Sequence, residues 1–79
     1  MDWRQHIITD PQVLAGKPVI RGTRLALDFV LGLFAAGWTE AQVLENYPSL
    51  TSDGVRAVFA YAAEILQDES LYPVKRTGS

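Results

Sequence analysis

Residues 38–55, WTEAQVLENYPSLTSDGV, contain one complete helix and the start of the next. Thr39 is suited to be an N-cap, and Gln42 stands three positions later, which is the capping-box spacing. Pro48 ends this helix, because the residue before a proline avoids the helical region. Thr51 is suited to be the N-cap of the following helix. The stretch predicts two helices joined by a short link, which is the crossing pair of a helix-turn-helix.

An earlier helix is predicted from Leu27 onward. Its apolar side chains follow the period of one helical stripe: Phe29, Val30, Leu33 and Phe34. Gly37 is suited to the C′ position after this helix, with Trp38 packing back on Leu33. Five aromatic side chains are expected in the core: Phe29, Phe34, Trp38, Tyr47 and Phe59.

The third predicted helix begins after Thr51 and is apolar on most of its surface. Its main stripe is Val55, Val58, Phe59, Ala62 and Leu66, and Tyr61 and Ile65 form a second apolar edge. A helix with so wide an apolar surface needs more than one neighbour. In a chain of 79 residues we expect the second neighbour to be another copy of the chain. The predicted homodimer interface consists of Val58, Tyr61, Ala62 and Ile65.

Residues 1–26 are predicted to form a short β extension in front of the helices. Val19 and Ile20 are β-branched and follow Pro18, which belongs at the start or edge of a strand. Gly22 is expected to adopt a backbone conformation that other residues avoid. The fold class is therefore mainly α, with one domain over residues 1–69, of which 27–69 form three helices. Residues 70–79 are a tail, which is either disordered or orders on a partner.

The composition excludes several classes of protein. The chain has no Cys, which rules out a disulfide scaffold, a thiol nucleophile and a Cys-ligated zinc site. No apolar run is long enough for a membrane span, so we expect a cytoplasmic protein with no membrane partner. A chain of 79 residues has little material for a closed pocket, so we expect no enzyme, no cofactor and no metal. Glu64 and Asp68 are spaced to hold a cation, but a solvated helix face is the preferred interpretation.

Charge is distributed unevenly along the chain. The first 24 residues contain four cations, Arg4, Lys17, Arg21 and Arg24, against two carboxylates. Residues 25–69 contain one cation, Arg56, against seven carboxylates. A chain with a basic front and an acidic body is suited to phosphate on one surface and to a different partner on another.

Two groups of residues are candidates for contact with DNA. Lys17, Arg21 and Arg24, with the Thr23 hydroxyl, are suited to a phosphate backbone. The alternative is structural: Arg24 pairs with Asp28, and Arg21 pairs with Asp10. The second group stands at the start of the third helix and consists of Thr51, Ser52 and Arg56. Here the alternative is that Thr51 is only a cap and that Arg56 either pairs with Asp53 or is solvated.

The segment from Ile7 to Leu66 resembles the bacterial domain-of-unknown-function family 433. The residues that carry the resemblance are Asp10-Pro11, the block Gly16-Lys17-Pro18-Val19-Ile20-Arg21-Gly22-Thr23-Arg24, Ala36-Gly37, Tyr47-Pro48-Ser49-Leu50-Thr51 and Val55. The resemblance implies a homeodomain-like fold of three helices with a β extension at the front. It also implies an antitoxin-like role beside a PIN-like ribonuclease, with binding of the toxin and of the gene's own operator DNA.

This chain departs from the family pattern at two places. Gly54 stands where relatives usually carry an acid, and the third helix offers only Arg56 as a base-reading cation. The resemblance and the basic front segment predict an antitoxin-like DNA-binding module that neutralises a PIN-like ribonuclease and regulates its own operator. The alternative is a helix-turn-helix adaptor that binds only protein.

Overall fold

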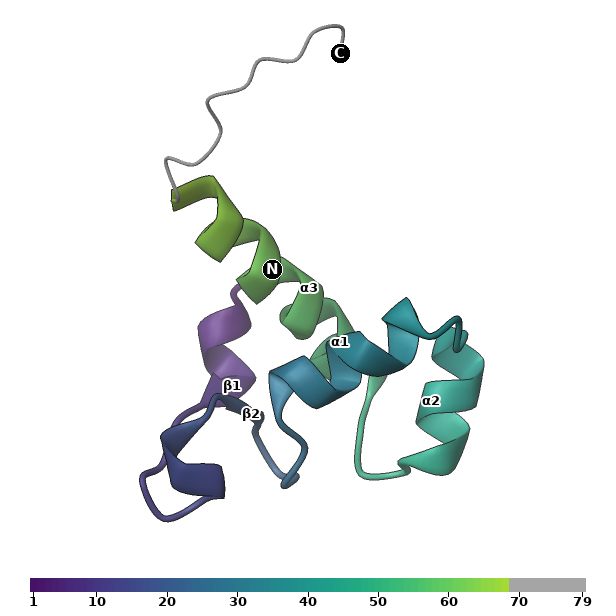
Figure 1. Cartoon of the computed structure of the whole chain (residues 1–79), viewed down its shortest axis with the longest axis horizontal. Coiled ribbons are helices and arrows are strands. Elements are labelled where there is room, and N and C mark those ends of the chain that lie inside the picture. Colours follow the sequence, from purple (N-terminus) through teal and green to yellow (C-terminus); the bar gives the residue numbers. More distant parts are fainter. Residues whose placement is uncertain (69–79) are drawn as a thin grey trace, which may run out of the picture.

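The computed structural model describes residues 1–68 and consists there of three α-helices, two short strands and two 3₁₀ turns (Figure 1). In chain order they are η1 (Trp3–Gln5), β1 (Ile7–Ile8), η2 (Leu14–Gly16), β2 (Val19–Ile20), α1 (Leu27–Ala35), α2 (Glu40–Asn46) and α3 (Ser52–Asp68). The mainly α class with a short β element at the front is thus confirmed. The predicted tail, residues 70–79, lies outside the described residues.

The ends of the helices follow the local sequence signals. After α1, Gly37 has φ 98° and its N–H donates to the Phe34 carbonyl, while the Trp38 N–H donates to the Leu33 carbonyl. This is the Schellman pattern, and it confirms the predicted end of α1. The capping box at the start of α2 is also confirmed, because Thr39 and Gln42 exchange both of its hydrogen bonds.

The start of α3 is set by Thr51. Its side-chain oxygen accepts a hydrogen bond of 3.0 Å from the Gly54 N–H, and its carbonyl accepts one from the Val55 N–H. Thr51 is therefore the N-cap, as predicted. The glycine three positions later is buried against the side chain of Ile20 in β2.

The strands form a small antiparallel sheet in which Ile7 pairs with Ile20 and Ile8 with Val19. The segment between them was not predicted in detail. Leu14 and Ala15, with φ of 50° and 57°, are left-handed although neither is glycine. Gly22, with φ 83°, adopts the unusual conformation expected of it.

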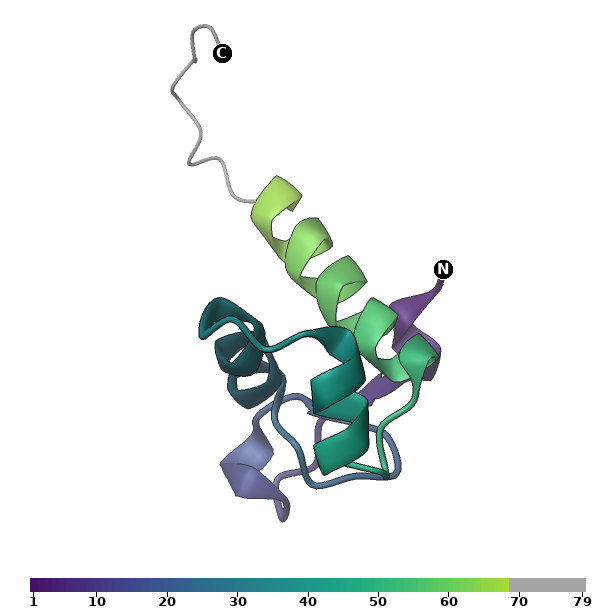
Figure 2. The same cartoon turned by 90° about the vertical axis from the view of Figure 1, so that its right-hand side faces the viewer.

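Aliphatic side chains fill the centre of the molecule. The largest side chains that are fully buried are Val19, Val30, Val43 and Val58. Around them lie Ile7, Ile20, Leu27, Leu50, Val55 and Ala57. In the described part of the chain, α3 contacts η1, β1, α1 and α2, so these four elements pack on it. The last turns of α3 extend beyond those elements (Figures 1 and 2).

The prediction that five aromatic side chains belong to the core is wrong for Phe29 and Phe59, whereas Phe34, Trp38 and Tyr47 pack against the buried cluster. Phe29 and Phe59 are each 44% exposed, and Phe34, Trp38 and Tyr47 are half-buried. The largest side chains that are fully buried are valines, so aliphatic groups occupy the centre. The rings pack edge to face at the periphery instead, with centroids 5.6 Å apart for Phe29–Tyr47 and 5.1 Å apart for Phe34–Phe59.

Candidate functional site

The cations of residues 1–26 do not form the ion pairs that the sequence analysis proposed as the structural alternative to a phosphate site. Lys17 Nζ lies 3.0 Å from Asp28 Oδ2, and Arg21 Nε donates to the Gln5 carbonyl at 3.0 Å. The alternative pairs Arg24–Asp28 and Arg21–Asp10 are therefore wrong. Arg24 is exposed and makes no hydrogen bond or ion pair within residues 1–68. Its guanidinium is the one cation of this group that has no partner within residues 1–68.

Asp28 connects the front segment to the first turn of α1. The hydrogen bond from the Lys17 ammonium holds the pKa of this carboxyl below its ordinary value. The carboxylate also lies at the N-terminal end of a helix, where the helix dipole favours a negative charge. The pair is exposed on both sides, so it orients the segment without adding much to stability.

Thr23 serves the turn after β2. Its hydroxyl donates to the Ile20 carbonyl at 2.8 Å and accepts from the Leu25 N–H at 3.0 Å. The one hydroxyl proton is thus committed inside the protein, and only an acceptor lone pair is left for the outside. A phosphate oxygen needs a donor, so this geometry removes the chemical basis for Thr23 as a phosphate contact.

The start of α3 is more acidic than a phosphate-binding helix end. Ser52 Oγ donates to Glu40 Oε2 at 2.7 Å, which places a carboxylate from α2 beside the predicted DNA contact. Arg56 is exposed and forms no ion pair with Asp53 or with any other described residue. Of the second predicted group, only Arg56 and the hydroxyl proton of Thr51 are uncommitted within the described part of the chain.

The apolar surface of α3 forms a groove with α1, which we call the α3 groove. It has a volume of about 380 Å³. Its lining consists of Pro18, Leu27, Asp28, Leu31, Tyr61, Ala62, Ile65 and Leu66. Three of the predicted dimer residues, Tyr61, Ala62 and Ile65, are therefore on one surface. The fourth, Val58, is wrong as an interface residue, because it is wholly buried in the core of its own protomer.

A second hollow, which we call the η2 groove, is lined by both members of the Lys17–Asp28 pair, and Asp28 also lines the α3 groove. It has a volume of about 640 Å³. Its lining consists of Leu14, Ala15, Lys17, Arg24, Leu25, Ala26, Asp28 and Phe29. The sequence analysis did not find this surface, because it depends on the unpredicted left-handed turn at η2.

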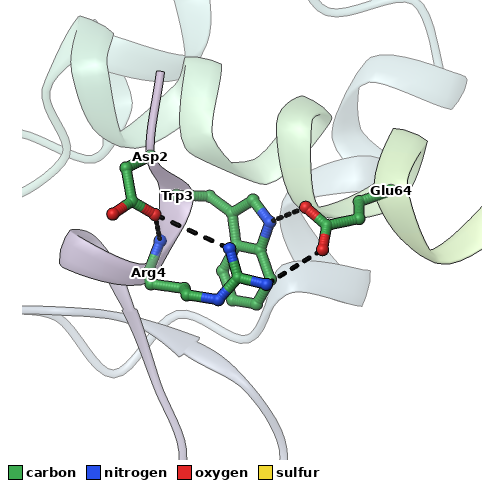
Figure 3. Close-up of polar contacts among 4 residues, drawn as sticks. All are labelled: Asp2, Trp3, Arg4 and Glu64. Atoms are coloured by element: carbon green, nitrogen blue, oxygen red, sulfur yellow. Dashed lines mark hydrogen bonds and ion pairs between the residues drawn. The ribbon is translucent and has the colours of Figure 1, made fainter.

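Glu64 has a role that the sequence analysis missed (Figure 3). Its two carboxylate oxygens accept from Trp3 Nε1 at 2.9 Å and from Arg4 Nη2 at 3.0 Å. The Trp3 hydrogen bond, followed by that from Arg4, lowers the pKa of the Glu64 carboxyl. Glu64 thus fastens η1 to α3, although its side chain remains partly exposed. Residues 1–68 contain no cluster of three His, Asp or Glu side chains suited to a metal ion.

These features define a small mainly α domain with a two-stranded N-terminal sheet and apolar grooves at its surface. The model of the family described as "Protein of unknown function (DUF433)" matches residues 7–62. The chain belongs to this family, as its Gly-Lys-Pro block indicated. None of the described helices is long and apolar enough to cross a membrane.

Two relatives are similar to this chain. The "Uncharacterized protein y4eO" of Sinorhizobium fredii (strain NBRC 101917 / NGR234) is 37% identical over 59 residues, which are 75% of this chain and 27% of the relative. This chain therefore matches only about a quarter of that relative's length. A crystal structure of a DUF433 member protein from Anabaena variabilis ATCC 29413 superposes with a TM-score of 0.71 at 28% identity. The superposition covers 77% of this chain and 60% of the other.

Proposed function

We propose that this domain is an antitoxin-like protein-binding module that forms a homodimer through the α3 groove and binds a PIN-like ribonuclease. The observation that carries the proposal is the apolar surface on α3, where Ile65 is 42% exposed beside the half-buried Tyr61 and Ala62. Exposed apolar side chains that line one groove are typical of interaction sites. The proposal assigns the domain no catalytic role and no cofactor, and it places the protein in the cytoplasm.

The resemblance to the family supports the choice of a ribonuclease as the partner. The charge of the helical part supports it too, because a basic nuclease surface suits a body in which seven carboxylates outnumber one cation over residues 25–69. Co-expression with the product of the adjacent gene tests this part. A stable complex with a PIN-like ribonuclease is expected. If the neighbouring product forms no complex, the antitoxin proposal is refuted.

The dimer is tested by mass measurement at several protein concentrations. The wild-type chain is expected at twice its monomer mass, and Ile65→Glu is expected at the monomer mass with an unchanged far-UV circular dichroism spectrum. Gln67→Glu is the matched control, because it adds the same charge at an exposed position of α3 outside the groove lining. A monomeric wild type, or equal effects of both variants, would contradict the assignment of the α3 groove.

The second candidate function is binding of operator DNA by a homeodomain-like helix-turn-helix made of α1–α3. It is favoured by the uncommitted guanidinium groups of Arg24 and Arg56 and supported by Arg21, Lys17 and Thr51, which retain free donors. Phosphate contacts would make DNA affinity fall as salt rises. Each neutralised phosphate contributes about −0.9 to the slope of log affinity against log salt concentration.

A DNA shift at two salt concentrations with Arg21→Glu/Arg24→Glu separates the two functions. Loss of a salt-sensitive shift in this variant would support a DNA-binding role. If the wild type gives no shift with its own upstream DNA, the protein-only function stands alone. The Glu40–Ser52 hydrogen bond at the start of α3 supports the protein-only function, since it keeps a carboxylate where phosphate would approach.

A further inference from the structure

The η2 groove differs from the α3 groove in its volume and its charge. Two of the large apolar side chains that the protein leaves exposed line it, Leu14 at 47% and Phe29 at 44%. Leu25 and Ala26 form the remainder of its apolar wall. The groove is therefore an apolar hollow of about 640 Å³ with side chains that no contact within the domain covers fully.

The position of Leu14 depends on an unfavourable backbone conformation. Leu14 and Ala15 both have positive φ, and residues with a Cβ seldom adopt such angles. The left-handed turn brings Leu14 to the rim of the groove but leaves it half in water. Hydrogen bonds from the Gly16 N–H to the Val13 carbonyl and from the Lys17 N–H to the Leu14 carbonyl hold this turn, so the domain itself keeps Leu14 at the groove.

Charge decides which kind of molecule fits. The groove contains three charged side chains, and two of them, Lys17 and Asp28, neutralise each other at 3.0 Å. The third, Arg24, is exposed and has no partner within residues 1–68. The groove therefore offers an apolar wall with one uncompensated positive charge beside it, and a complementary ligand carries an apolar group next to an anion.

We propose that the η2 groove binds a segment of a partner protein that carries an aliphatic or aromatic side chain close to a carboxylate. The apolar side chain packs between Leu14, Leu25 and Phe29, and the carboxylate pairs with the Arg24 guanidinium. Nucleic acid fits less well, because the wall of the groove is apolar and Arg24 is its only uncompensated cation among the described residues. The inference rests on the proposed function only in that the partner is a protein; it does not depend on the dimer.

The test uses the full chain and a displayed library of random twelve-residue peptides. Enriched peptides are synthesised, and their affinity is measured by fluorescence anisotropy. We expect the enriched family to share an acidic residue near an aliphatic or aromatic one. Arg24→Glu is expected to weaken binding about tenfold, because an exposed ion pair is replaced by repulsion of similar size. Replacing the acidic residue of the peptide by Lys is expected to restore binding to this variant.

Two further variants make the result specific. Arg56→Glu is the matched control, since Arg56 is also exposed and unpaired in the described chain but does not line the groove. It should leave peptide affinity unchanged. Leu14→Asn removes the apolar contact and suits the left-handed backbone, because Asn tolerates positive φ better than most residues. It should weaken peptide binding by about fivefold, a loss similar to that of one partly buried apolar side chain.

Several outcomes would overturn the inference. These are a library that yields no enriched family, peptides that bind Arg24→Glu as well as wild type, and an Arg24→Glu variant that loses only DNA retention. A halved mass for Arg24→Glu would place a second copy of the chain in the groove and would also refute the inference. Failure of the peptide test with an intact wild-type dimer would leave the proposed function standing, whereas a monomeric wild type that still binds the peptides would refute only the dimer.

Discussion

Replacement of Gly54 by Ala tests how closely α3 approaches the sheet. A Cβ at this position would lie 3.3 Å from Ile20 Cγ2, 3.4 Å from Thr51 Oγ1 and 3.7 Å from Leu50 Cδ2. The first distance is shorter than an ordinary contact between methyl groups. Ile20 is 3% exposed, and its backbone is paired with Ile7, so it has little freedom to move away.

Two opposing effects determine how much Gly54→Ala changes the free energy of unfolding. Ala favours a helix over Gly by up to about 1 kcal/mol, and by less in the first turn. Overpacking of a buried site costs about 1–3 kcal/mol. The packing term is larger here, so Gly54→Ala is expected to lower the free energy of unfolding by about 1 kcal/mol. The same contact explains why this chain has no acidic side chain at the third helical position.

Urea unfolding followed by far-UV circular dichroism gives the measurement. Gly32→Ala in α1 is the matched control, because Gly32 is exposed and a Cβ there would meet no atom within 4 Å. This control is expected to raise the free energy of unfolding by about 0.5–1 kcal/mol. If Gly54→Ala stabilises the protein as Gly32→Ala does, the argument from the 3.3 Å contact is refuted.

Three further predictions concern the capping, the core and the attachment of η1. Glu64 has a lowered pKa in the folded state, so its contribution to stability is fully present above the ordinary value of 4.5 and is lost as pH falls through the lower folded value. Glu64→Gln should therefore weaken the pH dependence of the free energy of unfolding in that acid range. An unchanged pH dependence in this variant would contradict the Trp3 contact. Thr51→Ala should cost about 1 kcal/mol in thermal unfolding while Thr51→Ser retains the cap, and equal loss in both would refute the capping role. Val58→Ala should cost about 2 kcal/mol in urea, whereas Ile65→Ala in dilute protein should cost less than about 0.5 kcal/mol; the reverse order would place Val58 at the surface.

The features that the sequence predicted correctly are local ones. The end of α1 at Gly37, the capping box at Thr39 and the cap at Thr51 each depend on residues within one or two turns of one another. Backbone groups at a helix end must find a partner nearby, so the chemistry of a few neighbours determines the boundary. The same reasoning located the β-branched pair of β2, because strand preference is also visible in a short segment.

The features that were missed depend on residues distant in the chain. Trp3 and Arg4 lie sixty positions or more before Glu64, and no periodicity connects a 3₁₀ turn to a helix. The choice of Lys17 over Arg24 as the partner of Asp28 depends on the path of the chain through η2, whose left-handed Leu14 has no sequence signal such as glycine. Predictions of pairing among exposed charges fail for this reason, since several partners are chemically equivalent.

The hydrogen bonds and ion pairs of the front segment indicate that protein binding is favoured over DNA binding. The basic front segment suggested phosphate, but the fold uses Lys17 to orient α1, Arg21 to hold the chain before β1 and Thr23 to close a turn. An intramolecular partner lowers the gain from a new contact, because the old one must be broken or shared. Of Lys17, Arg21 and Arg24, only Arg24 has no partner within residues 1–68, and it lines the apolar η2 groove. An unpaired cation beside exposed apolar side chains is suited to a protein segment that carries an apolar side chain near a carboxylate. The front segment therefore favours a protein over DNA as its partner.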